Sequence, residues 1–203
     1  IATGDYEDNN NFGKVKIYEW KGSVWNQIGI DLVGDAINSN FGISLDFSND
    51  GSRIIIGSNQ DGNNTNDGSI YPRGSAKVFN WNGNNWELLG SKLTPTNGYN
   101  DGQQHFGQNV SISGNGNNIS VIEGGHSCDI KLSIYEFVNF DWNLIFLDSL
   151  DSYSWNPNAF FNIAKCVLSE NGEIFNFSHG VSTYPTTPLY NGTIKSFNKS
   201  NIN

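Results

Sequence analysis

A tandem repeat constrains this chain more than any other feature of its sequence. The first of two landmarks is an alternating apolar segment that ends in a pair of aromatic residues five positions apart. The pair occurs at Trp20 and Trp25, at Trp81 and Trp86, and at Phe137 and Trp142. The second landmark is a glycine-containing turn after another alternating segment, at Gly51, Gly116 and Gly172. Two separate landmarks that recur in one order indicate a single structural unit repeated along the chain.

Each unit has the pattern of four short antiparallel strands. The clearest copy predicts strands at residues 41–48, 53–57, 74–81 and 86–89. Asn49-Asp50-Gly51 and Asn82-Gly83 are typical of tight hairpin turns, because Gly and Asn tolerate positive φ. No long window has the 3.6-residue apolar period of a helix. Four-stranded antiparallel units in tandem predict an all-β fold of the β-propeller type, in which each unit is one blade.

The 203 residues hold about three and a half such blades and are treated as a single propeller region. The repeat units run approximately over residues 1–53, 54–118, 119–174 and 175–203, and the last is incomplete. A closed propeller has at least about four blades. We therefore expect a fragment of a larger ring, whose remaining blades lie outside this sequence.

The tryptophans of the aromatic pairs are expected in the core between blades. Burying one such side chain removes roughly 150–250 Å² from water, which strongly favours the packed state. This expectation covers Trp20, Trp25, Trp81, Trp86 and Trp142. Trp155 lies outside the repeat pattern and is expected to be exposed.

Several elements of the repeat resemble the FG-GAP repeat of integrin-α-like β-propellers. They are the Phe-Gly steps at Phe41-Gly42 and Phe106-Gly107, the β-rich run that ends at Gly57, and the later Gly-x-Val-x-Ile-Tyr strand that starts at Gly13. The resemblance covers nearly the whole chain in diverged form, and favours the type found in large bacterial and environmental surface proteins. It implies an extracellular or cell-surface location and a role in binding or adhesion. The family's acidic Ca²⁺ loop is not matched, because only short turns stand in its place.

Composition excludes several classes of function. The net charge is −9 with only 11 Lys and Arg residues and no basic cluster, so a nucleic-acid partner is not expected. No apolar run approaches the roughly 18 residues that a membrane helix needs, so membrane insertion is not expected. No nucleophile elbow, phosphate-binding loop or zinc-protease motif occurs. We therefore predict a non-enzymatic module without catalytic residues.

The predicted ligand contacts lie in the loops between strands, since blades hold position while loops vary. These loops cover residues 5–12, 58–73, 94–105 and 182–191. The partner is expected to be a protein or a glycan, and the candidate contact residues are Trp155, Tyr99 and Tyr184. The alternative is a carbohydrate-binding or carbohydrate-active propeller, a lectin or a glycoside hydrolase, in which these aromatics cluster beside carboxylates.

One loop is the candidate metal site. Oxygen-bearing side chains alternate at Asp61, Asn63, Thr65 and Asp67, as in short Ca²⁺ loops, but the bidentate Glu of an EF-hand is missing. Such a loop predicts a Ca²⁺ site with a dissociation constant of roughly 10⁻⁴–10⁻³ M. The alternative is a plain polar connection, and no other cofactor is expected.

Other constellations are open to two interpretations. Cys128 and Cys166 allow either one disulfide or two unreactive buried thiols. His126 and His179 suit either a zinc site or solvated loops.

Overall fold

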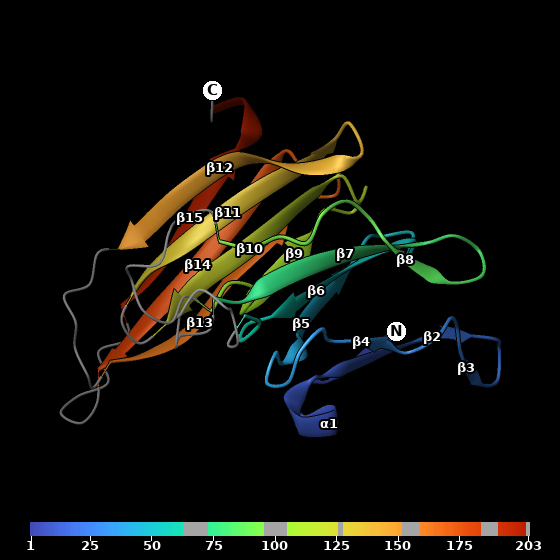
Figure 1. Ribbon diagram of the computed structural model, residues 1–203. Coiled ribbons are helices and arrows are strands. Elements are labelled where there is room, and N and C mark those ends of the chain that lie inside the picture. Colours follow the sequence, from blue (N-terminus) through green and yellow to red (C-terminus); the bar gives the residue numbers. More distant parts are fainter. Residues whose placement is uncertain (63–72, 96–104, 126–127, 152–158, 184–190, 202–203) are drawn as a thin grey trace.

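The computed structural model describes residues 1–62, 73–95, 105–125, 128–151, 159–183 and 191–201 (Figure 1). Within these ranges the helical elements are one turn, α1 (Asp8–Asn11), and one 3₁₀ turn, η1 (Lys199–Asn201). The remaining elements are strands, and every strand pair is antiparallel. The prediction of an all-β fold is confirmed.

The strands form four sheets that follow one another along the chain. The first sheet contains β1 (Ala2–Asp5), β2 (Lys14–Trp20) and β3 (Trp25–Gln27), with β4 (Leu32–Val33) paired to β2. The second contains β5 (Phe41–Phe47), β6 (Arg53–Ser58), β7 (Ser75–Trp81) and β8 (Trp86–Leu88). The third contains β9 (Asn109–Ile112), β10 (Asn118–Gly125), β11 (Cys128–Val138) and β12 (Asp141–Asp151). The fourth contains β13 (Ala159–Leu168), β14 (Ile174–Thr183) and β15 (Asn191–Asn198).

The sheets fan out side by side (Figure 1). Their first strands lie toward the middle of the fan, where β5 contacts β9 and β9 contacts β13. Their last strands, such as β8 and β12, lie at the outer edges. Sheets of this kind, arranged with their first strands toward one axis, are the blades of a β-propeller. The chain forms part of such a ring.

The core lies between the sheets, where three apolar clusters join each sheet to the next. The three consecutive isoleucines of β6 explain how one strand serves two clusters. Ile54 and Ile56 belong to the cluster shared with the first sheet, and Ile55 belongs to the cluster shared with the third. Because successive side chains of a strand point to opposite faces, an unbroken apolar run fits a sheet that is covered on both sides.

The expectation for Trp20 and Trp25 is wrong. Their exposed fractions are 50% and 49%, whereas Trp86 is 4% exposed. Trp86 is buried because it packs on the segment that follows the outer strand of the preceding sheet, where a Cβ at Gly29 would lie 2.8 Å from its ring. In the described part of the chain no sheet lies on the corresponding side of Trp20 and Trp25.

The phenylalanines of the Phe-Gly steps pack against glycines of the preceding sheet. Gly74 of the second sheet has φ +82° and lies against Phe106, so closely that an added Cβ would overlap the Phe106 carbonyl oxygen. Gly13 of the first sheet, with φ +78°, lies in the same way against Phe41. Positive φ and the close approach both require glycine at these positions.

Tight turns lie together at one end of the sheets, which we call the turn end. In the turns of three sheets, a serine hydroxyl donates to an Asp or Asn side chain two residues later. The pairs are Ser48 with Asp50 at 2.7 Å, Ser113 with Asn115 at 2.8 Å, and Ser169 with Asn171 at 2.8 Å. The turns also bond to one another, because the Asn49 N–H donates to the Gly114 carbonyl at 2.9 Å and the Asn115 N–H to the Glu170 carbonyl at 2.7 Å.

Candidate functional site

Strand direction places the long connections at the end of the sheets opposite to the turn end. We call this the loop end. The connections that reach it include residues 6–13, 59–74, 89–108, 152–158 and 184–190, whereas no hairpin turn at the turn end exceeds five residues. Only the connection between β10 and β11, at residues 126–127, is short at the loop end. Long connections, the elements that most often carry ligand contacts in a rigid fold, are therefore concentrated at one end of the sheets.

The predicted aromatic contact residues all belong to connections of the loop end. Trp155 lies between β12 and β13, Tyr99 between β8 and β9, and Tyr184 between β14 and β15. All three lie outside the described residues.

Of the predicted metal ligands, Asp61 is described, and Asn63, Thr65 and Asp67 lie outside the described residues. Asp61 is 7% exposed, and its carboxylate already has partners. The Ser75 hydroxyl donates to Asp61 Oδ2 at 2.6 Å, and Lys92 Nζ lies 3.1 Å from the same oxygen. A cation at Asp61 would have to compete with the charge of Lys92.

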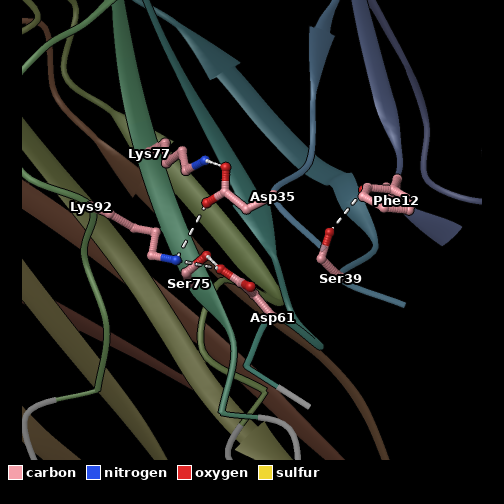
Figure 2. A network of polar contacts seen from close by, with 7 residues as sticks. All are labelled: Phe12, Asp35, Ser39, Asp61, Ser75, Lys77 and Lys92. Atoms are coloured by element: carbon pink, nitrogen blue, oxygen red, sulfur yellow. Dashed lines mark hydrogen bonds and ion pairs between the residues drawn. The ribbon is translucent and has the colours of Figure 1, made fainter. Parts of the chain in front are cut away.

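Asp61 belongs to a network of charged groups at the loop end (Figure 2). Lys92 Nζ also lies 3.4 Å from Asp35 Oδ2, and Lys77 Nζ lies 2.5 Å from Asp35 Oδ1. Asp35 follows the first sheet, whereas Lys77 is on β7 and Lys92 follows β8. The network therefore ties the connection after the first sheet to the second sheet.

The electrostatics of the network favour the charged forms of Asp35 and Lys92. Burial by itself would raise the pKa of Asp35, but the hydrogen bond and charge of Lys77, together with Lys92, outweigh it and lower the pKa. Burial would likewise lower the pKa of Lys92, but the hydrogen bond and charge of Asp61, with Asp35, raise it. Neither group is shifted toward neutral pH, where a general acid or base works best. The arrangement is that of a structural clamp.

A second polar row connects the second and third sheets at the loop end. The Asn40 side chain donates to Asn59 Oδ1 at 3.3 Å, and the Asn59 side chain donates to Gln108 Oε1 at 2.5 Å. The His105 ring lies 3.3 Å from the Asn59 carbonyl oxygen. These amides follow β6 or precede β5 and β9, so they fix the bases of the connections that extend beyond them.

The described residues offer little for metal or thiol chemistry. Among them no group of three or more His, Cys, Asp or Glu side chains could hold a metal ion. Cys166 is a free, buried thiol, which decides between the two interpretations of this cysteine. Burial raises the pKa of Cys166 to about 11, more than the neighbouring Ser120 hydroxyl lowers it, so the thiol is unreactive at neutral pH.

Sequence reasoning did not find Asp35, Lys77 or Lys92. Asp35 lies in a connection without a repeat signal, and its partners are more than forty residues away. Lys77 stands where the first repeat has Lys16, so repeat alignment marks the position but gives no sign of its partner. Only the packing of the two sheets brings these charges together.

The fold and the site define the class of protein as a β-propeller, and comparison with solved structures agrees. No protein-family model matches the sequence, and no curated protein matches it. A "putative 6-phosphogluconolactonase" from Bacteroides uniformis is similar with a TM-score of 0.51 and 13% identity, over 93% of this chain and 50% of that one. The Dos1 propeller is similar with a TM-score of 0.50 and 11% identity, over 92% of this chain and 40% of that one. The chain thus spans about half or less of these structures, and the likeness concerns the fold alone.

Proposed function

We propose that this chain is a non-enzymatic binding or structural module of a secreted or cell-surface protein. It contacts a protein or glycan ligand through the connections of the loop end. The observation that carries the proposal is the asymmetry of the sheets, with tight turns at one end and nearly all long connections at the other. Rigid strands that present long connections on one side are a common design for recognition.

Two further observations support a binding role rather than catalysis. Four charged groups at the loop end, Asp35, Asp61, Lys77 and Lys92, are paired with one another, and Cys166 is buried. In the described part of the chain, no helix has the length and apolar character needed to cross a membrane.

The Phe-Gly packing against glycines of the preceding sheet supports a diverged repeat of the FG-GAP type.

A carbohydrate ligand is the second candidate, because Trp155, Tyr99 and Tyr184 belong to connections of the same end. Aromatic side chains suit the apolar faces of sugar rings, so these three residues are the candidate contacts with the sugar. In this form the chain is a lectin, or a glycoside hydrolase if two carboxylates of the same end act on the bound sugar.

Binding assays with matched variants test the proposal. The chain is applied to a glycan array and to cells, and its binding is compared with that of Trp155→Ala, Tyr99→Ala and Tyr184→Ala. Phe140→Ala is the control, because Phe140 is 90% exposed but lies in the β11–β12 turn at the turn end. We expect at least one loop-end variant to weaken binding at least tenfold and the control to leave it unchanged. Loss of binding only in Phe140→Ala would assign recognition to the turn end. Release of sugar products would show that the chain is a glycoside hydrolase rather than a non-enzymatic module.

A further inference from the structure

Asn-Gly steps are chemically labile points of this chain. The backbone nitrogen of the residue after an asparagine can attack the side-chain amide carbon, and glycine has no side chain to hinder the approach. Asn97-Gly98 lies outside the described residues, and Asn191-Gly192 begins the paired strand β15. The three other steps lie in tight turns of the turn end, at Asn82-Gly83, Asn115-Gly116 and Asn171-Gly172.

The asparagine side chains of these three turns are held in the same way. The Oδ1 atoms of Asn82, Asn115 and Asn171 each accept a hydrogen bond from the N–H two residues later, at 2.9 Å, 2.9 Å and 3.1 Å. Asn82 Oδ1 also accepts from the Asn85 N–H at 2.8 Å, and the other two oxygens accept from serine hydroxyls at 2.8 Å. Two donors stabilise the negative charge that such an oxygen gains when its carbon is attacked. The asparagines alone therefore do not distinguish the three steps.

The glycine amides do distinguish them. The Gly116 N–H donates to the Ser113 carbonyl at 2.8 Å, the Gly172 N–H donates to the Ser169 carbonyl at 3.0 Å, and both glycines are buried. Gly83 is exposed, and within the described ranges its N–H has no acceptor. The attacking group is the glycine nitrogen after it has lost its proton, so a hydrogen bond that holds this proton must break before the attack.

We propose that Asn82 is a site of spontaneous deamidation in the folded protein. The Gly83 nitrogen loses its proton and forms a bond to Asn82 Cγ, and the side-chain nitrogen leaves with a proton as ammonia. The product of this step is a succinimide ring. Water then opens the ring at one of its two carbonyl carbons, which leaves either aspartate or isoaspartate in place of Asn82. The net reaction consumes water and releases ammonia in equal amounts, without oxidation or reduction.

Deamidation changes the contacts of the turn between β7 and β8. The Asn82 Nδ2 group donates to Glu87 Oε1 at 2.7 Å, and the Asn82 N–H donates to the Asn85 carbonyl at 3.1 Å. An aspartate places a second carboxylate against Glu87, whereas an isoaspartate adds a methylene group to the backbone of the turn. The site belongs to the turn end, so the proposed ligand binding at the loop end can fail without affecting it.

The test follows deamidation of the full, unchanged chain by peptide mapping with mass spectrometry. The chain is incubated in mildly alkaline buffer, once folded and once in urea, and the folded rate at each step is divided by the rate of the same step in urea. We expect Asn115 and Asn171 to react roughly tenfold more slowly or more when folded, because the turn must open first. Asn82 should react within about threefold of its rate in urea, since the Gly83 amide is already exposed. Its products should include isoaspartate.

Two glycine variants provide a matched comparison. Gly83→Ala adds a Cβ beside the attacking nitrogen and should slow the deamidation of Asn82 in the folded chain roughly tenfold or more. Gly22→Ala changes the corresponding turn of the first sheet, where the glycine also has positive φ and open space, and should leave the rate at Asn82 unchanged. Three results would overturn the inference: equal protection of the three steps in the folded chain, no slowing by Gly83→Ala, or aspartate without isoaspartate. The last result would indicate direct hydrolysis of the side-chain amide.

Discussion

At the scale of single residues, the junction glycines have the most specific role. Gly74 and Gly83 both have positive φ, +82° and +96°. They differ in surroundings, because Gly74 lies against the backbone of Phe106 whereas Gly83 has open space around it. Alanine substitutions at the two positions therefore separate the free-energy cost of left-handed backbone from the cost of steric overlap, which usually occur together.

We predict that Gly74→Ala lowers the free energy of unfolding by about 2–5 kcal/mol. Left-handed backbone costs an alanine roughly 1–2 kcal/mol, and overpacking adds about 1–3 kcal/mol. Gly83→Ala should cost about 1–2 kcal/mol, because only the backbone term applies. Urea unfolding of the two variants measures the difference, and equal losses would show that the contact with Phe106 is unimportant.

Asp141 holds the third sheet to the second. Its Oδ1 accepts hydrogen bonds from the N–H groups of Ser91 at 2.7 Å and Trp142 at 2.8 Å, and its Oδ2 accepts one from the Ser91 hydroxyl at 3.0 Å. The bond from the Ser91 N–H, followed by that from Trp142, lowers the pKa of Asp141. Asn85 has the corresponding place in the second sheet and accepts from the Ile30 N–H at 3.2 Å.

The lowered pKa of Asp141 predicts a loss of stability in acid. Its contribution is complete above the unfolded pKa of about 3.9 and disappears as the pH falls through the lower folded pKa. Asp141→Asn should retain a bond to Ser91, as Asn85 does with Ile30, and should unfold with a weaker dependence on pH below 4. Urea midpoints between pH 2 and 7 test this. An unchanged acid dependence in Asp141→Asn would mean that other carboxylates are responsible.

At the scale of elements, sequence patterns were most reliable where a strand is regular. The predicted strands of the second repeat agree with β5 to β8 within one residue at each end. The sequence did not indicate the length of β12, which runs from Asp141 to Asp151. Two register shifts against β11, after Ile130 and after Ile134, interrupt its alternation and hide the strand from a period-two search.

The exposure of an element depends on neighbours that its own sequence does not show. Trp20 and Trp81 occupy equivalent places, and only the packed sheets distinguish them. The same holds at the loop end, where repeat spacing predicts the positions of the connections but not the ion pairs between Asp35, Lys77 and Lys92. Pattern therefore predicts strands and turns, and packing decides which residues meet.

Arg53 of β6 links two elements of the turn end. Its Nη1 donates to the Gly116 carbonyl at 2.8 Å and to Asn117 Oδ1 at 2.9 Å, and its guanidinium lies 5.3 Å from the centre of the Phe137 ring. We predict that Arg53→Ala lowers the free energy of unfolding by about 2–3 kcal/mol. Arg53→Lys should recover less than half, because an ammonium cannot reproduce the planar contacts. Urea unfolding measures these losses. If Arg53→Lys is as stable as the unchanged chain, the positive charge of Arg53 matters and its planar contacts do not.

At the scale of the whole molecule, the charged network at the loop end joins the first two sheets. Lys92→Met removes a cation from Asp61, whose side chain is 9% exposed, and should cost about 1–3 kcal/mol. Lys21→Met is the control, because the pair of Lys21 with Glu19 is exposed and should contribute less than about 1 kcal/mol. Similar losses in thermal or urea unfolding would contradict a special role for the buried carboxylate.

The same network leads to a prediction about calcium. Because Lys92 already neutralises Asp61, we expect the chain to melt at the same temperature in millimolar Ca²⁺ and in chelator. A higher melting temperature in Ca²⁺, abolished by Asp61→Asn with Asp67→Asn, would instead identify residues 61–68 as a binding loop. Calorimetric titration with Ca²⁺ alone provides a second measurement.

The core clusters that join each sheet to the next have a consequence for how the chain gains and loses structure. Since each sheet depends on its immediate neighbours, its free energy resembles a sum of local contributions and nearest-neighbour couplings. Unfolding can then begin at either terminal sheet and proceed inward one sheet at a time. Such a chain loses strict two-state cooperativity, and its van't Hoff enthalpy falls below the calorimetric enthalpy. Folding has the complementary property that any adjacent pair of sheets can serve as the nucleus.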